Sequence, residues 1–590
     1  MNALILVSAL LLNQSYGPKV KADPNNPQPG SIGRKIPNFV LPLPNDKKAS
    51  LSDFNESKSL VFVFLSTNCP VSNAYIPTLN ELSQKHKKSE VQFIGIYANP
   101  GDTKESINQH VRDFKISFPV VYDVEQITLR LFGARRTSEV FVLDQRRNIQ
   151  YQGRINDQIS NTARKEKPTV DDLANAIDQV LNLKKVTVAF TEPPGCLITH
   201  LSKSINSKIT YESHIAKILF KNCADCHHPG TAAPFSLLSY EDAKNNGAMI
   251  KEVTSLHTMP PWHADTRFGH FANERKLSSE EIAQIASWVD AGMPAGDLAK
   301  APKPPAFSEG WRLGKPDIVF QIPEEVTIQP KGTVGYKYFS VKTNFKEDMW
   351  LKAAEPRPGN RSVVHHIIVF YREPGKGKRP VWIAATAPGA EPVIHPDGMG
   401  RRIPAGSDII WQIHYTPTGK EEKDRSEVAF VFCKEKPKQN IETHGIANNL
   451  FLIPPLAFNH EVVSSITAKK DAVILTFFPH MHLRGKDFEY QVQYPDGKVE
   501  TILSVPQYDF NWQSTYRLKE PLKIPKGSKI KCVAHFDNSK LNPANPAPWK
   551  PVFYGEQTWE EMMIGYIDFY YVDDVAPLKL LQGPINSSKP

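Results

Sequence analysis

The 590-residue chain has no internal hydrophobic run that approaches the ~20 residues of a membrane-spanning helix. It also lacks blocks of basic residues and basic stripes interleaved with aromatic side chains. Lys and Arg outnumber Asp and Glu by only 71 to 62, a net charge of +9. We therefore expect no transmembrane anchor and no nucleic-acid partner. With 40% hydrophobic and 23% charged residues, the composition is that of a globular protein of several domains.

The amino terminus lacks the basic residues that usually open a secretory signal, but the rest of that pattern is present. Residues 1–12 form an apolar run too short to cross a bilayer, and a polar stretch with small residues at Gly17 and Ala22 follows it. Residues 1–22 are thus predicted to be a signal peptide. Such a segment would send the protein to the periplasm or outside the cell.

Residues 31–185 alternate between strand and helix patterns, and a cysteine stands just before the first helix. The order strand, cysteine, helix, strand is typical of a thioredoxin-like α/β domain. The stretch resembles the AhpC/TSA-like peroxiredoxins and the TlpA-type redoxins over most of its length. We expect strands over residues 60–65 and 91–97, a helix to about residue 87, and a late hairpin over 140–143 and 149–153.

Cysteine is scarce in this region, although the chemistry of redoxins depends on it. Cys69 lies at a predicted helix N-terminus, where the helix dipole lowers the pKa of a thiol, so it is a candidate redox thiol. The second cysteine of a Cys-x-x-Cys pair is replaced by Ser72, and residues 136–140 lack the proline that this fold normally places beside the active cysteine. Cys196 is the only nearby resolving candidate. The alternative is a degenerate redoxin that serves for docking or stability.

The one Cys-x-x-Cys pair of the chain follows an amphipathic segment, residues 211–220, and continues into a histidine as Cys223-Ala-Asp-Cys-His227. This pattern is typical of c-type haem: both thiols form thioethers with the vinyl groups, and the imidazole becomes the proximal ligand. A zinc site would need a second pair of ligands. A thioredoxin-type dithiol would follow a strand, whereas this context is helical. One haem c, bound by Cys223, Cys226 and His227, is therefore predicted.

The distal haem ligand is expected to be a methionine some tens of residues further on. Met259 is followed by two prolines that would fix a loop against the haem. Met293 is its rival, after a helix that begins with the capping pattern at Ser278. Residues 208–297 resemble a small class I cytochrome c, an all-α domain. A His/Met pair would favour electron transfer over ligand binding.

After a proline-rich spacer at residues 297–310, helical periodicity almost disappears up to about residue 575. Short strands and turn signals take its place, which predicts antiparallel sheets. We expect two β-sandwich (jelly-roll-like) domains, residues 311–440 and 445–580, joined near residues 440–450.

Histidines in this part of the chain stand in or beside the predicted strands. His480 and His482 are two residues apart, so both imidazoles would point to one face of a strand. Adjacent His365 and His366 could share a ligand only at a strand end, a bulge or a strong twist. Imidazole suits copper, and the thioether of Met562 prefers Cu(I). Taken singly, each histidine could instead be a hydrogen-bonded core or surface residue.

The order of these segments resembles the type II copper monooxygenases, the peptidylglycine and dopamine hydroxylating family, over about residues 311–580. The resemblance implies a two-domain copper module with two coppers. It implies an electron-transfer copper at His365, His366 and His414, and an oxygen-activating, catalytic copper at His480, His482 and Met562, with Met563 as the competing choice for the last ligand.

Two departures from that family limit what can be carried over. The peptide-processing members place an arginine two residues before the His-x-His pair to hold a substrate carboxylate, and Phe478 stands there in this chain. A peptide C-terminus is therefore a poor substrate. The animal enzymes are also rich in disulfides, whereas only Cys433 and Cys532 lie in this region.

Together these patterns predict an exported oxidoreductase that hydroxylates an sp³ C–H bond of a small molecule with O₂. The fused haem, or a reductant or donor protein acting through it, would supply the electrons. The main alternative is an extracytoplasmic electron carrier or copper-binding protein without hydroxylase activity. A thiol peroxidase driven by the haem is a third reading, and it rests on Cys69 alone.

Overall fold

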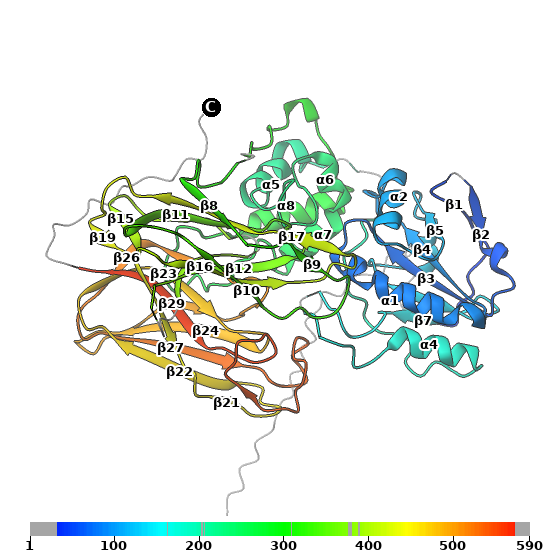
Figure 1. The fold of residues 1–590 in the computed structure, drawn as a ribbon. Helices are drawn as coiled ribbons and strands as arrows, with labels where there is room; N and C mark the ends of the chain where they lie inside the picture. Colours follow the sequence, from blue (N-terminus) through cyan, green and yellow to red (C-terminus); the bar gives the residue numbers. More distant parts are fainter. Residues whose placement is uncertain are drawn as a thin grey trace, which may run out of the picture.

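The computed structural model describes residues 32–45, 47–161, 163–201, 205, 207–307, 310–375, 380–387 and 390–572. The expected signal peptide, residues 1–22, lies outside them. Figure 1 shows an α/β unit on the right, a group of short helices at the top and a large β region on the left. The domain limits predicted from the sequence remain predictions.

The α/β unit is built on a five-stranded sheet in the order β5-β4-β3-β6-β7. Strands β3, β4 and β5 are parallel, and β6 and β7 run antiparallel to their neighbours. All seven residues of β3 are buried, as expected of a central strand covered on both faces. The predicted strands and hairpin are confirmed as β3 (Ser59–Leu65), β4 (Val91–Tyr97), β6 (Val140–Leu143) and β7 (Ile149–Gly153). The edge strand β5 (Val120–Tyr122) was not predicted.

Helices cover both faces of this sheet and enclose two hydrophobic clusters. Cys69 is the N-cap of the first helix, α1 (Pro70–His86), and Pro70 occupies the first turn, where a missing N–H is tolerated. The fold is thioredoxin-like, as predicted. The remaining helices are α2 (Lys104–Asp113), α3 (Ile127–Phe132) and α4 (Asp172–Leu181), and a small hairpin of β1 (Val40–Pro42) and β2 (Lys48–Ser50) precedes them.

The middle of the chain forms a helical group around one small core. Its last helix begins with the expected capping box, in which the Ser278 hydroxyl accepts from the Glu281 N–H and the Glu281 carboxylate accepts from the Ser278 N–H. The elements are a π-helical turn (Tyr211–Ile215), α5 (Ala216–Asn222), α6 (Tyr240–Asn245), α7 (Gly247–Ser255) and α8 (Ser279–Asp290).

Between α7 and α8 the chain leaves this helical group and joins the β region. Ala264 and Phe271 belong to the core of the second β-sandwich, and Phe271 forms an isolated antiparallel bridge with Leu518. The Trp262 ring lies 5.1 Å from the Tyr516 ring. Part of the segment predicted as a helical domain, residues 208–297, therefore packs into the core of the second β-sandwich.

The first β-sandwich packs a four-stranded sheet, β10-β16-β12-β13, against a sheet in the order β19-β15-β11-β18-β8. Residues from both sheets form one core. The strands are β8 (Ile318–Gln321), β10 (Lys337–Lys342), β11 (Met349–Arg357), β12 (Val364–Arg372), β13 (Val381–Thr386), β15 (Met399–Ile403), β16 (Asp408–Tyr415), β18 (Glu427–Phe432) and β19 (Gln439–Asn440), with β14 (Val393–Ile394) on β11 and a β9 (Val326–Ile328) and β17 (Glu422–Asp424) pair beside them.

The second β-sandwich packs β20-β29-β23-β26 against β22-β27-β24-β25. Inward and outward residues alternate along β24, where Phe488, Tyr490 and Val492 are buried. The strands are β20 (Glu442–Ala447), β22 (His460–Thr467), β23 (Ala472–His480), β24 (Gly485–Gln493), β25 (Val499–Val505), β26 (Tyr516–Ile524), β27 (Lys529–Phe536) and β29 (Ile564–Tyr571), with a short β21 (Leu452–Ile453) and β28 (Val552–Phe553) pair.

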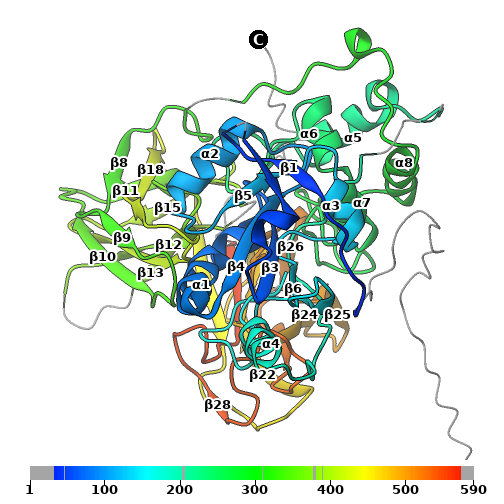
Figure 2. The ribbon, with the colours of Figure 1, turned by 90° about the vertical axis from the view of Figure 1, so that its right-hand side faces the viewer.

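The two sandwiches meet through aromatic and charged side chains. Trp382 of β13 lies 5.5 Å from the Phe478 ring and 5.2 Å from the Tyr566 ring. The buried Arg401 donates to Asp568 at 3.3 Å across the same boundary. Figure 2 shows the α/β unit in front of the β region, and there Arg164 donates to the Pro417 carbonyl at 2.8 Å.

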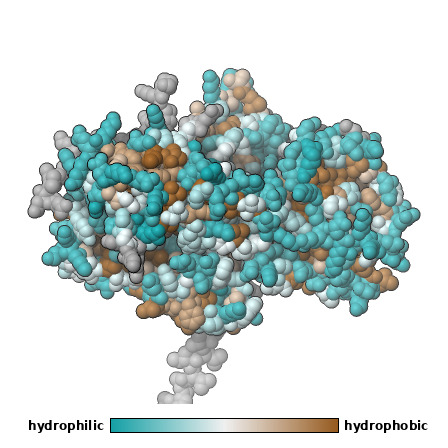
Figure 3. All heavy atoms as spheres, viewed as in Figure 1, coloured by the Kyte–Doolittle hydropathy of each residue, from teal (hydrophilic) through white to brown (hydrophobic). Residues whose placement is uncertain are grey.

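Hydrophilic side chains cover most of the face seen in Figure 3, and hydrophobic ones gather there in separate small groups. Among the described residues, no helix has both the length and the apolar character needed to cross a membrane.

Candidate metal centres

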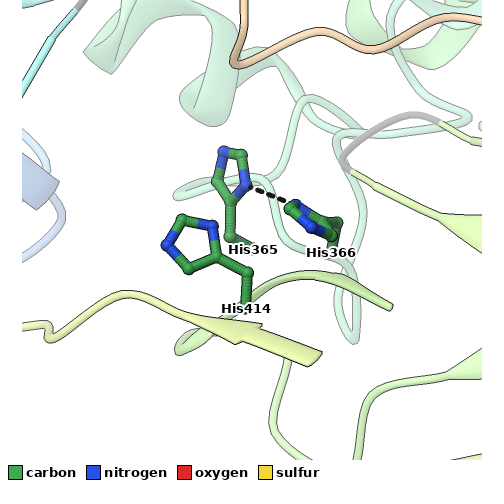
Figure 4. Close-up of side chains that lie close together, drawn as sticks. All are labelled: His365, His366 and His414. Atoms are coloured by element: carbon green, nitrogen blue, oxygen red, sulfur yellow. Dashed lines mark hydrogen bonds between the residues drawn. The ribbon is translucent and has the colours of Figure 1, made fainter. Parts of the chain in front are cut away.

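Three histidines from two neighbouring strands converge in the first sandwich (Figure 4). His365 and His366 lie on β12, and His414 of β16 stands opposite His366 in the strand register. One nitrogen from each ring can be chosen so that all three lie within 4.8 Å of one another. This spacing is suited to three imidazoles around one ion.

A β-bulge accounts for the convergence of adjacent residues. The register between β12 and β16 shifts between Val364 and His366. On a regular strand the two neighbouring imidazoles would face opposite ways, whereas a bulge re-aims one of them. The His365 and His366 rings lie 5.4 Å apart, and each is 5.2 Å from the His414 ring.

The electrostatics of this cluster favour neutral imidazoles. Burial lowers the pKa of His365 to about 4 and that of His414 to about 3, and it holds the pKa of His366 well below its usual value. The Nδ1 atoms of His365 and His366 face each other at 3.2 Å, and the buried Nδ1 of His414 has no hydrogen-bond partner. Neutral imidazole nitrogens are what a copper ion requires, so these residues fit the metal.

A second pair of histidines stands where β23 ends. His480 is the last residue of the strand, and the His482 ring lies 5.2 Å from it. The Nδ1 of His480 donates to Gln513 Oε1 at 2.7 Å, and that of His482 donates to the Glu560 carbonyl at 3.3 Å. With its Nδ1 engaged, the Nε2 of His480 is left for a metal, an arrangement common to histidine ligands. The His482 side chain also hydrogen-bonds to the backbone of Gln557.

The two adjacent methionines have different surroundings. Met563 is fully buried in the core of the second sandwich, whereas Met562 is only half-buried. The preceding Glu561 ties this segment to the histidine pair, because its carboxyl group accepts from the N–H of His482 at 2.8 Å and of Arg484 at 2.6 Å. Of the two thioethers, the one at position 562 lies outside the core.

A loop at residues 506–515, between β25 and β26, touches both histidine groups. The Phe510 ring lies 5.7 Å from the His365 ring and 5.9 Å from the His482 ring. Asn511 hydrogen-bonds to the His365 side chain. Sequence reasoning missed this loop, since none of its residues is spaced in register with the histidines and only the folded chain brings them together.

Replacing Gln513 with leucine removes the acceptor for His480 Nδ1 while keeping a similar side-chain volume. Loss of such an outer partner typically costs about 10–100-fold in metal affinity. We expect the Cu(I) affinity of one of two sites to fall by this factor. Competition with a chromogenic Cu(I) chelator measures the affinity. Gln491→Leu is the control, because Gln491 binds Glu489 on β24. Equal affinities in both variants would show that Gln513 does not hold a ligand.

The residues predicted to bind haem lie together at the end of α5. Cys223 is the C-cap of that helix, and the Nδ1 of His227 donates to the Phe235 carbonyl at 3.0 Å. This bond leaves His227 Nε2 free, as a proximal ligand requires. Arg275 Nη1 lies 3.9 Å from Cys226 Sγ. Two thiols and an imidazole are the donor types that a c-type haem takes.

The two candidate distal methionines lie in different environments. Met293 is buried in the helical core, and its sulfur fills the place that a side chain at Gly247 would take. Met259 lines a pocket together with Trp262, Arg275, Leu277 and Ile282. Arg275, which lines this pocket, is also the residue whose Nη1 lies 3.9 Å from Cys226 Sγ.

Cys69 lies in the α/β unit, apart from both histidine groups. Its sulfur accepts from the Ser72 N–H at 3.4 Å, and its side chain is 1% exposed. Cys196 is hydrogen-bonded to it. The candidate redox thiol and its predicted partner are therefore neighbours.

Two family models match separate parts of the chain. Residues 32–152 match the AhpC/TSA family, and residues 433–583 match the copper type II ascorbate-dependent monooxygenase, C-terminal domain. The second match contains the strand that ends at His480, the His482 position and Met562.

Similar proteins cover the α/β unit. The thiol-disulfide oxidoreductase ResA of Bacillus thuringiensis subsp. konkukian (strain 97-27) is 29% identical over 113 residues, which is 19% of this chain and 64% of that protein. The chain thus spans less than two thirds of the length of this relative. ResA of Bacillus anthracis is 28% identical over 136 residues, or 23% of this chain and 73% of that protein.

A crystal structure of a hypothetical protein from Sinorhizobium meliloti 1021 is 26% identical, with a TM-score of 0.27, and the match covers 29% of this chain and 95% of that one. The two family models show that the chain combines a redoxin domain of the AhpC/TSA family with the C-terminal domain of the copper type II ascorbate-dependent monooxygenases, an oxidoreductase domain that uses copper.

Proposed function

We propose that the protein is an exported copper monooxygenase that hydroxylates an sp³ C–H bond of a small molecule with O₂. One copper is assigned to His365, His366 and His414, and the other to His480, His482 and Met562. A single haem c at Cys223, Cys226 and His227, with Met259 as distal ligand, supplies the electrons. The family match at residues 433–583 and the two histidine groups support the copper assignment.

Copper, when bound, supplies one-electron redox chemistry and the activation of O₂. The chain's own residues orient the ligands: Gln513 and the Glu560 carbonyl fix the rings of His480 and His482. Burial lowers the pKa of His365 and His414 and so keeps these imidazoles neutral.

The surroundings of His480 favour an apolar substrate. Phe478 stacks 6.4 Å from the His480 ring, and Trp382 and Tyr566 complete an aromatic wall. The substrate is therefore assigned as a small molecule whose reacting C–H bond lies in an apolar or aromatic part.

Haem, when bound, would accept and donate one electron. Ligation by His and Met gives it a high reduction potential. The observation that carries the proposal is the path of the chain after Met259. Three residues later the Trp262 ring packs 5.1 Å from the ring of Tyr516, the first residue of β26. Tyr516 directly follows the loop in which Gln513 binds His480. The expected haem ligand and the second histidine pair are thus joined through protein packing.

Export and domain limits are part of the proposal. We assign a signal peptide to residues 1–22, a redoxin domain to 31–185 and a cytochrome c domain to 208–297. We assign the two β-sandwich domains to residues 311–440 and 445–580. The relatives are named as thiol-disulfide oxidoreductases, and this chain matches a copper monooxygenase domain. Both findings are consistent with a periplasmic or secreted protein.

The test measures copper and haem content together with oxygen consumption under a reductant that reduces the haem. About two coppers per haem, with oxygen consumption that rises on addition of apolar small molecules, is the expected result. Two coppers without turnover would favour an electron carrier or copper-binding protein. Absence of haem in protein exported by a cell that matures c-type cytochromes would contradict the electron-supply part.

Replacing Trp262 with leucine is expected to slow reoxidation of the haem by copper and O₂ several-fold, because it removes the aromatic contact with Tyr516. Stopped-flow absorbance of the reduced haem band measures this rate. Trp549→Leu is the control, since Trp549 is 59% exposed. Unchanged rates in Trp262→Leu, with unchanged copper content, would rule out this route.

A further inference from the structure

The segment that follows the redoxin domain is held against the loop before β6. Arg136 and Leu197 form an antiparallel bridge, the Thr137 N–H donates to the Cys196 carbonyl at 2.9 Å, and the Cys196 N–H donates to Thr137 Oγ1 at 3.2 Å. This loop occupies the place where a proline was expected. The pairing brings the Cys196 side chain onto the sulfur of Cys69 at the start of α1.

Gly195 is what allows so close an approach. Its φ is +107°, and a Cβ there would lie 2.1 Å from the Thr137 carbonyl oxygen. Arg136 donates to the Gly195 carbonyl at 2.8 Å and pairs with Glu252 of α7. The position of Cys196 is therefore fixed by backbone and side-chain contacts on both sides.

We infer that Cys69 and Cys196 form a reversible dithiol–disulfide couple, in which the segment after the domain supplies the second cysteine that position 72 lacks. Cys69 is 1% exposed, whereas Cys196 is only partly buried. Cys196 is thus the more exposed residue of the pair, and we assign the attack of an external thiol to it. This activity is independent of the copper and haem chemistry proposed above.

The electrostatics of the pair fit these roles. Burial raises the pKa of Cys69, but hydrogen bonds from Cys196, Thr137 and the Ser72 N–H outweigh it and bring the pKa to about 6. The hydrogen bond to Cys69, together with burial, holds the pKa of Cys196 well above its usual value. Near neutral pH the charge therefore lies on Cys69, which makes it the better leaving group when the disulfide opens.

The reaction is thiol–disulfide exchange with an external thiol. A glutathione thiolate attacks the Cys196 sulfur, the Cys69–Cys196 bond breaks, and its electron pair leaves on Cys69 as a thiolate. A second glutathione thiolate attacks the glutathione sulfur of the mixed disulfide and releases Cys196, which takes a proton. Two glutathiones become one oxidised glutathione, and the couple gains two electrons.

The test equilibrates the full-length protein in glutathione redox buffers, then blocks free thiols and maps the peptides by mass spectrometry. We expect Cys69 and Cys196 to change together in a single two-electron transition. Cys69→Ser and Cys196→Ser should abolish it, whereas Cys433→Ser should not, because Cys433 lies in the first sandwich, where its thiol donates to the Met399 carbonyl at 3.7 Å.

Reaction with oxidised glutathione distinguishes the roles of the two sulfurs. Cys69→Ser should accumulate one stable glutathione adduct on Cys196, whereas Cys196→Ser should react much more slowly at the buried Cys69. Two thiols that stay reduced at every potential, or a disulfide that opens only after unfolding, would overturn the inference. Copper content measured in the same variants keeps this outcome separate from any failure of the monooxygenase proposal.

Discussion

Replacing Met562 with leucine is expected to remove the sulfur from the second copper centre and to lower oxygen consumption at least about 100-fold. Loss of a residue that only hydrogen-bonds to a metal ligand typically lowers metal affinity or activity about 10–100-fold. Loss of a ligand itself should therefore lower it further. Leucine has a similar volume, which limits changes in packing. X-ray absorption of the reduced protein reports the effect directly, because copper–sulfur scattering should disappear.

Met563→Leu is the matched control for this experiment. Met563 is fully buried among the core residues of the second sandwich, where such a swap usually costs less than about 1.5 kcal/mol. Copper–sulfur scattering and oxygen consumption should therefore survive. If the scattering is lost in Met563→Leu and kept in Met562→Leu, the ligand assignment is reversed. If both variants keep it, the second centre contains no methionine.

Replacing Glu561 with alanine is expected to lower the free energy of unfolding by about 2–6 kcal/mol, because each buried donor left unpaired costs about 1–3 kcal/mol. The fully buried Glu561 accepts from the N–H groups of His482 and Arg484. Both belong to the turn that carries the second histidine of the pair. We expect this turn to loosen and one Cu(I) site to weaken while the three-histidine site is kept.

Denaturant unfolding of the metal-free protein, followed by Cu(I) competition, measures both effects. Glu500→Ala is the control, since Glu500 is exposed on β25 and should change stability by less than about 0.5 kcal/mol. Glu561→Gln keeps one carbonyl oxygen as an acceptor, so its free energy of unfolding should lie between those of Glu561→Ala and Glu500→Ala. Wild-type stability in Glu561→Ala would mean that the two N–H groups find other partners.

The sequence by itself determined most local structure. The strand at β3 follows from an unbroken apolar run, and the start of α8 follows from the reciprocal bonds of Ser278 and Glu281. Both depend on residues close together in the chain, so spacing and composition predict them. The candidate ligands were also predictable as residue types, because His-His, His-x-His and Cys-x-x-Cys-His are local patterns.

Only the tertiary structure decided which residues meet. The bulge before His366, the loop in which Gln513 binds His480, and the contact of Cys196 with Cys69 all join segments far apart in sequence. The crossing of residues 264–271 into the second sandwich is of the same kind. Such contacts depend on the path of the chain and on the burial of apolar surface, for which local periodicity carries no signal.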